Sequence, residues 1–490
     1  MGTGVTDRRY TDKDFLTFQA RLDEQLQQLK QVLQQPGFGS DPLHMGAELE
    51  MYLADAQGSV SQCNQNLLDA LGDSQFQPEL NQYNIELNLS AFAIGQNPLE
   101  KLHNEMQAKT AKLEAVAARQ GVDVIPIGIL PTLRREHLHK GLITPLPRYH
   151  SLATHLYQQR GEDFTINING ADPLSVSFAD ISAEGANTSF QVHCMVPPEC
   201  FVQVFNAAQL TAPLVVAVAA NSPVFLGHRL WDETRIALFK QSLDVRQRGH
   251  ANWRQPTRVN FGFGWLRHSP WELFAEAVAL YPVVLPAVDS NLDDNDLPSL
   301  KELLLHIGTI WSWHRPVYCP SGSGHVRIEF RAIPAGPTSI DMMANAAFAI
   351  GLAMGLADRI DDLISFVPFR FAEYNFYRAA QAGLDSKLLW PVNGCRPQET
   401  DITAIIEQLL PVAQQGLEIL GIANGERYLK VIEERLQQRM TGARWQRQAL
   451  DYYSRKSDRD SACQKMLRNY LQQCRSAQPV SQWERPWNCQ

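Results

Sequence analysis

Glutamate residues recur at alternate positions within segments whose other residues are typical of β-strands. Glu48 and Glu50 flank one leucine, and Glu86 and Asn88 flank another. Side chains at positions i and i+2 of a strand point to the same face, so each pair shares one face and the leucine takes the other. Each of the two segments therefore predicts a strand with carboxylates on one face.

Two further segments carry ionisable groups in the same alternation. Glu329 lies between Arg327 and Arg331, and His193 follows Gln191 at the same spacing. Taken alone, each of these strands is more typical of a sheet with one hydrated face. Such a face normally mixes lysine, threonine and serine with acids, whereas these segments concentrate glutamate, histidine and arginine. Their combination favours a chemical site over a plain hydrated face.

Clustered carboxylates repel one another unless a cation neutralises them. Carboxylate oxygens are the ligands that Mg²⁺ and Mn²⁺ prefer, and these ions commonly bridge substrate phosphates. Arginine in the same layer adds forked donors for phosphate oxygens. From the residues alone we therefore expect a metal–nucleotide site on the concave face of a sheet.

The common nucleotide-binding and hydrolase motifs are absent from the sequence. It contains no GxxxxGK[ST] and no GxGxxG after a predicted strand. Kinase catalytic-loop motifs, HExxH and GxSxG are also missing. These absences exclude P-loop enzymes and give no support for a dinucleotide-binding fold.

Strands and helices alternate irregularly along the chain. Strands are expected over residues 44–53, 82–89, 122–128, 164–168, 188–196, 258–263 and 325–332. Helices are expected between the cap Thr11 and the stop at Pro36, between Pro98 and Gly121, and over residues 199–220, 270–278, 297–306 and 339–357. From about residue 384 the pattern predicts only helix. Several of the strands are expected to be antiparallel, which favours an α+β fold over a doubly wound sheet.

Three regions are expected. Residues 1–38 form an N-terminal helical lead, residues 39–375 a catalytic domain, and residues 376–490 a helical region packed on that domain. The helical ends would also suit a homo-oligomer, or would fold back on their own domain.

Length, charge and cysteine content narrow the class of protein. The 490 residues are 44% hydrophobic and 20% charged, as in globular proteins. The net charge of −8 gives no bulk attraction for nucleic acid or an anionic membrane. The eight cysteines form no CxxC pair and the N-terminus is polar, which favours a cytoplasmic protein. The longest apolar run, residues 212–220, is too short to span a bilayer and predicts a buried helix.

Several segments together resemble glutamate–cysteine ligase family 2, the carboxylate–amine ligase group, which shares its catalytic fold with glutamine synthetase. They include G-x-E-x-E at residues 46–50, Glu79 before the second acidic strand, and the Arg-Tyr pair at Arg148. The strand ending at His193, Asn-Ser-Pro at residues 221–223 followed by Arg235, and R-x-E-x-R at residues 327–331 complete the set. These matches follow the family order from about residue 44 to 360.

The resemblance implies a fold, an activity and a set of site residues. The fold would be α+β, a curved antiparallel sheet of the glutamine synthetase/guanido kinase catalytic type, with helices on one face and a helical C-terminal region. The activity would be ATP- and Mg²⁺- or Mn²⁺-dependent joining of an amino-acid carboxylate to an amine, through an acyl phosphate. The implied metal ligands are Glu48, Glu50, Glu79, Glu86, His193 and Glu329. A core histidine is the alternative for His193.

The resemblance also implies roles for other side chains. Arg327 and Arg331 would contact ATP and, with Glu329, act in catalysis. Arg148, Arg235 and Asn88 would bind substrate, and for the two arginines a surface or supporting role is equally expected.

The sequence departs from the family pattern where substrate would bind. Residues 127–131 replace the usual G-T-H-P, Asn88 stands where threonine is expected, and residues 231–234 differ before Arg235. Two other functions therefore stay open. One is a phosphotransferase of guanido kinase type, against which the carboxylate cluster argues. The other is a non-catalytic relative that binds nucleotide or amino acid.

Overall fold

The centre of the molecule is an antiparallel β-sheet, seen in the computed structural model of residues 10–247, 255–288, 296–391 and 396–487. The strand order is β13-β14-β8-β1-β3-β2, and β4 and β5 also pair with β1. The strands are β1 (His44–Ala54), β2 (Phe76–Pro78), β3 (Asn84–Asn88), β4 (Phe92–Ala93), β5 (Asp123–Ile125), β8 (Phe190–Met195), β13 (His314–Cys319) and β14 (His325–Phe330). The expected α+β class with an antiparallel sheet is confirmed.

The register of the sheet gathers the ionisable residues on one face. Glu48 pairs with Asn88 on β3 and with Gln191 on β8, and Glu50 pairs with Glu86. His193 pairs with Glu329 on β14. The side chains between them, such as Leu49 and Ile328, are fully buried on the opposite face.

Two long apolar helices cover the buried face of the sheet. These are α5 (Phe201–Ala219) and α9 (Ser339–Leu356), whose side chains share one hydrophobic core with those of the strands. By length and composition, residues 198–219 and 339–366 would suffice to cross a membrane, but 89% of the most apolar 18-residue window in each is buried inside the molecule. They are therefore core helices, as expected for the apolar run at residues 212–220. The helix α3 (Pro98–Ala118) joins the same core.

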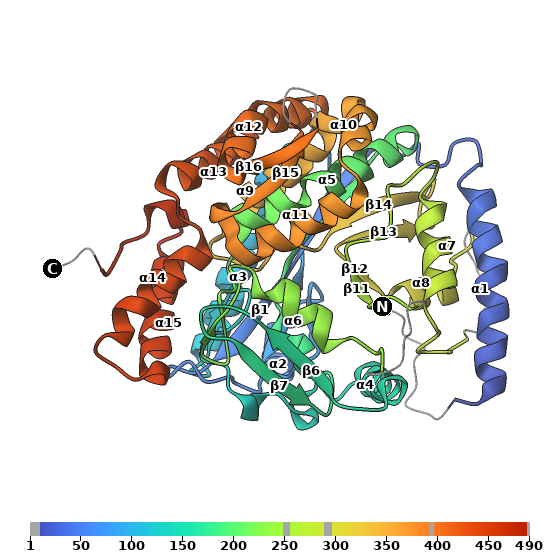
Figure 1. Ribbon diagram of the computed structural model, residues 1–490. Coiled ribbons are helices and arrows are strands. Elements are labelled where there is room, and N and C mark those ends of the chain that lie inside the picture. Colours follow the sequence, from blue (N-terminus) through green and yellow to red (C-terminus); the bar gives the residue numbers. More distant parts are fainter. Residues whose placement is uncertain (1–9, 248–254, 289–295, 392–395, 488–490) are drawn as a thin grey trace.

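Three helices stand beside the β13 edge of the sheet. They are α1 (Asp12–Val32), α7 (Trp271–Leu280) and α8 (Lys301–Ile307), and Figure 1 shows them together at one side of the molecule. Trp271 of α7 donates a hydrogen bond from its indole to the Leu26 carbonyl of α1. The N-terminal helix is thus docked on the molecule rather than separate from it.

The remaining elements before the C-terminal region are short. Three two-stranded sheets pair β6 (Phe164–Ile168) with β7 (Leu174–Phe178), β9 (Val224–Phe225) with β10 (His228–Arg229), and β11 (Val259–Asn260) with β12 (Trp311–Ser312). The short helices are α2 (Asn64–Leu71), α4 (Pro147–Arg160), α6 (Thr234–Ser242) and α10 (Ile360–Phe366).

The C-terminal region is not wholly helical, so that prediction was wrong. After α11 (Phe369–Ala382), the strands β15 (Lys387–Pro391) and β16 (Pro397–Asp401) form an antiparallel hairpin. Leu388 and Trp390 alternate inward, which is a strand period rather than a helical one. The helices α12 (Ile402–Ile419), α13 (Glu426–Gln438), α14 (Gly442–Ser454) and α15 (Arg459–Arg475) follow. In Figure 1, α14 and α15 lie on the side of the molecule opposite α1.

Candidate active site

Three strands bring Glu48, His193 and Glu329 together. One ligand atom from each lies within 4.8 Å of the others. The His193 Nε2 is 3.0 Å from Glu48 Oε1 and 3.8 Å from Glu329 Oε1. We call these three residues the histidine cluster. It contains one imidazole nitrogen and two carboxylates, a ligand set suited to a divalent ion.

Arginine side chains surround Glu329, which is only 1% exposed. Arg315 of β13 donates from both Nε and Nη2 to the two Glu329 oxygens, and Arg331 Nη1 donates to Oε1 at 3.0 Å. Burial alone would raise the pKa of Glu329, but Arg315 and Arg331 outweigh it and hold that pKa well below its ordinary value. Glu329 is therefore charged without any added cation.

His193 is held from its other side by Arg327. The Arg327 Nε donates to His193 Nδ1 at 3.1 Å, whereas Nε2 has no hydrogen-bond partner among the described residues. Nε2 instead lies close to the Glu48 carboxylate, 3.0 Å from Oε1. Burial alone would raise the pKa of Glu48, yet nearby His193 keeps it below the ordinary value. A buried imidazole nitrogen without a partner, facing two carboxylates, fits a metal ligand.

Glu50, Glu79 and Glu86 form a second group, the acidic cluster. Their ligand atoms also lie within 4.8 Å of one another. Burial and repulsion from Glu86 raise the pKa of Glu50 to about 7, and burial and repulsion from Glu50 raise the pKa of Glu79 to about 7. Burial and Glu79 raise the pKa of Glu86 well above its ordinary value. Without a cation, this cluster therefore retains protons near neutral pH.

Gln191 connects the two clusters. Its Nε2 donates to Glu50 Oε1 at 2.8 Å, and its Oε1 accepts from Arg331 Nη1 at 2.5 Å. Arg331 in turn donates to Glu329. One amide and one guanidinium thus fix the distance between the clusters, a rigidity that suits two ions acting on one substrate.

The predicted substrate residues Asn88 and Arg148 lie beside the acidic cluster. Asn88 Nδ2 donates to Glu86 Oε1 at 2.5 Å. Arg148 Nη2 donates to the Tyr149 hydroxyl, which itself donates to the Pro78 carbonyl one residue before Glu79. The Arg148 guanidinium makes no ion pair within the described part of the chain. It is therefore available to an anion.

Arg235 lies deeper and is only 2% exposed. Its Nη1 pairs with the buried Glu233 at 3.1 Å, and its Nη2 reaches the Arg331 carbonyl at 3.4 Å. Its charge also lowers the pKa of Glu50, although burial prevails. Arg235 therefore holds the Arg331 backbone in place and adds positive charge near the acidic cluster.

Two site residues were missed by the sequence analysis. Arg315 belongs to β13, which was not predicted because Pro316 interrupts the segment. Glu184 lies in a short 3₁₀ turn with no strand alternation around it, and burial together with Glu50 raises its pKa to about 8. Pro316 obscured the strand pattern around Arg315, and nothing local pointed to Glu184.

Comparison with known proteins identifies a matching family and a solved structure with the same fold. Residues 44–472 match the description "Glutamate-cysteine ligase family 2". A protein of Salinispora tropica named for glutamate–cysteine ligase 2 is 22% identical over 84% of this chain and 91% of its own length. A protein of Rhodococcus jostii named for glutamate–cysteine ligase 2-1 is 28% identical over 38% of this chain, and the match spans only 43% of that relative.

A solved structure shares the fold. The glutamate–cysteine ligase of Francisella tularensis, crystallised with AMP, superposes with a TM-score of 0.54 at 11% identity, covering 89% of each chain. Its likeness at this identity supports the arrangement of sheet and helices and not the residues of the site.

Proposed function

Because this chain belongs to glutamate–cysteine ligase family 2, we propose that it is an ATP- and Mg²⁺-dependent carboxylate–amine ligase. It forms an amide through an acyl phosphate, with a γ-glutamyl donor. The observation that carries the proposal is the meeting of two carboxylate-containing clusters, linked through Gln191 and Arg331, on one face of the sheet.

The histidine cluster is assigned to the nucleotide side. When bound between its ligands, Mg²⁺ (or Mn²⁺) would withdraw negative charge from phosphate oxygens. The Arg327 side chain makes no ion pair in the described part of the chain, and its Nε donates to His193. Its remaining donors are free for a phosphate, as in other phosphoryl-transfer sites. Arg331, already oriented by Glu329 and Gln191, would stabilise the transferring group.

The acidic cluster is assigned to the donor acid. Arg148 and Asn88 beside it would orient the acid, and Arg235 would keep Arg331 in place behind it. An oxygen of the donor carboxylate attacks the γ-phosphorus of ATP, and ADP leaves with the electrons of the broken P–O bond. The amine nitrogen then attacks the acyl carbon, inorganic phosphate leaves, and the nitrogen loses a proton.

Phosphate release tests the proposal directly. Purified protein with ATP, Mg²⁺ and L-glutamate is assayed against a panel of amines that includes L-cysteine. Amine-dependent release is expected, and Glu329→Gln should lower kcat by about a hundredfold to a thousandfold, because it removes a proposed carboxylate ligand of the ion and the charge that orients Arg331.

The matched control is Glu434→Gln, on α13, where the carboxylate accepts from Ser481 and Gln482. It should retain activity. Formation of ADP without release of inorganic phosphate would indicate a phosphotransferase instead. Metal-dependent ATP binding with no turnover for any amine would indicate a binding protein.

A further inference from the structure

Gln446 of α14 is a fully buried amide in the C-terminal region. Its Nε2 donates to both oxygens of Asn221, the backbone carbonyl at 3.1 Å and Oδ1 at 2.8 Å, across 225 residues of sequence. The next residue, Arg447, pairs with Asp232 at 2.8 Å. The helix α14 is therefore attached at two points to the segment that leads to Arg235.

The side chain of Asn221 is enclosed on all sides. A β-carbon added at Gly442 of α14 would lie 2.1 Å from Asn221 Oδ1, and one added at Gly336 would lie 2.9 Å from Nδ2. That Nδ2 donates to the Ala335 carbonyl at 2.7 Å and to the Tyr470 hydroxyl at 2.9 Å. Because interiors packed this closely transmit small displacements, the position of α14 fixes the position of Asn221.

Hydrogen bonds continue from Asn221 to Arg331. The Asn221 amide N–H donates to Glu233 Oε2 at 2.9 Å, and Glu233 Oε1 pairs with Arg235 Nη1 at 3.1 Å. The Arg235 guanidinium in turn donates to the carbonyls of Ala332 and Arg331, each at 3.4 Å. The side chains along this path are buried, so water does not compete for these bonds.

Arg331 is the arginine assigned to the transferring phosphoryl group. Its side chain is oriented by Glu329 and Gln191, and its backbone N–H donates to the Trp313 carbonyl at 3.0 Å. A guanidinium stabilises developing charge only when it already lies in the right place. A displacement of Arg235 therefore moves Arg331 relative to the reacting group.

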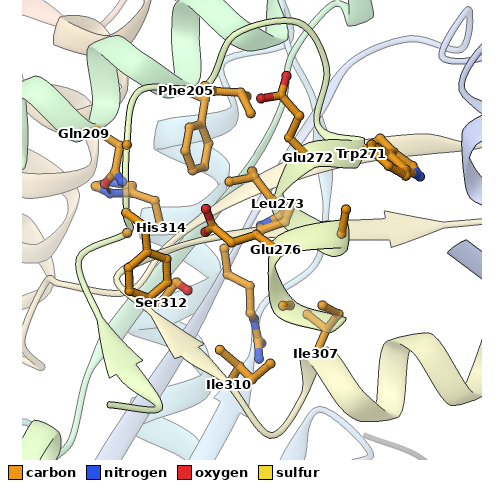
Figure 2. Close-up of a pocket in the computed structure, with 18 of the residues that line it drawn as sticks. Phe205, Gln209, Trp271, Glu272, Leu273, Glu276, Ile307, Ile310, Ser312 and His314 are labelled. Carbon is orange, nitrogen blue, oxygen red and sulfur yellow. Dashed lines mark hydrogen bonds between the residues drawn. The ribbon is translucent and has the colours of Figure 1, made fainter. Parts of the chain in front are cut away.

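The path is separate from a cavity at the other side of the molecule. That cavity, of about 570 Å³, lies beside α7 at the β13 edge of the sheet (Figure 2). Figure 1 shows α7 and α14 at opposite sides. None of the residues that form the path lines the cavity. A change in turnover on substituting Gln446 is therefore not an effect on a ligand in that cavity.

We propose that Gln446 is a positioning residue for Arg331. It acts through Asn221, Glu233 and Arg235, and it gives the C-terminal region a part in phosphoryl transfer beyond packing. This inference rests on the proposed ligase function and deepens it.

The first test separates kcat from KM. Gln446→Met keeps the length of the side chain and removes both donated hydrogen bonds. It should lower kcat for amine-dependent phosphate release about tenfold to a hundredfold, the effect of a small displacement of a catalytic group. The KM values for ATP and for the amine should stay within about threefold, because the lost contact acts on the transition state. A raised KM with unchanged kcat would overturn the proposal.

Two further variants separate position from stability. Gly442→Ala places a methyl group against Asn221, although alanine is otherwise favoured over glycine in a helix, and it should also lower kcat about tenfold or more. The matched control is Asn375→Leu, a buried amide of α11 that makes two hydrogen bonds with the Leu389 backbone. It should lower stability in urea and keep kcat within about twofold. Equal losses of kcat in Asn375→Leu and Gln446→Met would contradict a positioning role.

A double substitution tests the path itself. Arg235→Lys keeps the charge and loses the forked guanidinium. If Gln446 acts through Arg235, adding Gln446→Met to that variant should lower kcat by no more than about twofold further. Two losses that multiply would show that the residues act independently and would overturn the path.

A mimic of the phosphoryl group tests the inference without turnover. Calorimetry compares Mg²⁺–ADP with and without aluminium fluoride, which takes the place of the transferring group. In Gln446→Met, binding of Mg²⁺–ADP should be unchanged, and the extra affinity from aluminium fluoride should fall about tenfold. That loss, with no phosphate release by the unchanged protein for any amine, would overturn the ligase and leave the positioning role standing.

Amine-dependent release, with the same extra affinity in Gln446→Met as in the unchanged protein, would overturn the positioning role alone. An unchanged protein with neither release nor extra affinity from aluminium fluoride would overturn both.

Discussion

The histidine cluster and the acidic cluster use similar ligands on the same sheet, yet their charges are balanced in opposite ways. Glu329 is neutralised by Arg315 and Arg331, so its pKa is held low despite burial. In the acidic cluster, burial and mutual repulsion raise the pKa of both Glu50 and Glu79 to about 7. Glu329 of the histidine cluster is therefore ionised without a bound cation, whereas the acidic cluster gives up its protons when a cation binds.

The difference assigns a separate role to each cluster. In the histidine cluster, arginine already neutralises Glu329, so an added ion gains less binding free energy there. Such a site suits an ion that binds together with a polyanion such as ATP. A site of three acids that form no ion pair among the described residues gains most from the ion itself, because the ion replaces protons that the cluster otherwise holds. The two clusters should therefore respond differently in three measurements.

The largest expected effect is the loss of the arginine that supports Glu329. Arg315→Gln removes two donors from a buried carboxylate, and breaking one side of a buried ion pair costs about 3–5 kcal/mol. Urea unfolding without Mg²⁺ measures this loss of stability. The control is Arg370→Gln, where an exposed arginine pairs with Glu373 and the change should stay within about 1 kcal/mol. Equal losses in both variants would contradict the charge balance described here.

An intermediate effect is expected in the acidic cluster, with the opposite sign for stability. Glu86→Gln resembles the protonated acid, so the metal-free protein should be at least as stable as the unchanged one at neutral pH. The Mg²⁺ concentration that half-stabilises the protein should rise about tenfold or more, because one carboxylate ligand is lost. Thermal melts across a Mg²⁺ series check both outcomes. A destabilised metal-free variant would mean that Glu86 is charged in the absence of the ion.

The smallest effect is a pH dependence. Glu50 and Glu79 have folded pKa values raised to about 7, above the unfolded value near 4.5. Folding therefore takes up protons, and the stability from these groups is present at low pH and is lost as pH rises through about 7. Added Mg²⁺ should raise Tm by a few degrees more at about pH 8 than at about pH 6. The Glu79→Gln variant should reduce this difference, and an identical Mg²⁺ effect at both values would refute the protonation of the acidic cluster.

Strand faces were predictable because they depend on local geometry. Alternation in residues 44–53 and 325–332 needs no knowledge of neighbours, and β1 and β14 carry their glutamates on one face as expected. Arg315 was not predictable in the same way, since Pro316 argues against a strand. At the sheet edge, β13 tolerates that proline because one of its sides needs no ladder hydrogen bonds. The β15–β16 hairpin was missed because its strands are short and follow a helical stretch.

The sequence by itself determined which residue types stand on the polar face, since side-chain direction along a strand follows from the backbone. Only the tertiary structure decided how those residues divide between the histidine cluster and the acidic cluster. The order β14-β8-β1 places Glu329 and His193 beside Glu48, and the pairing of β1 with β3 places Glu50 beside Glu86. Charge balance depends on distances between strands remote in the chain, and those distances are set by packing the apolar face against α5 and α9.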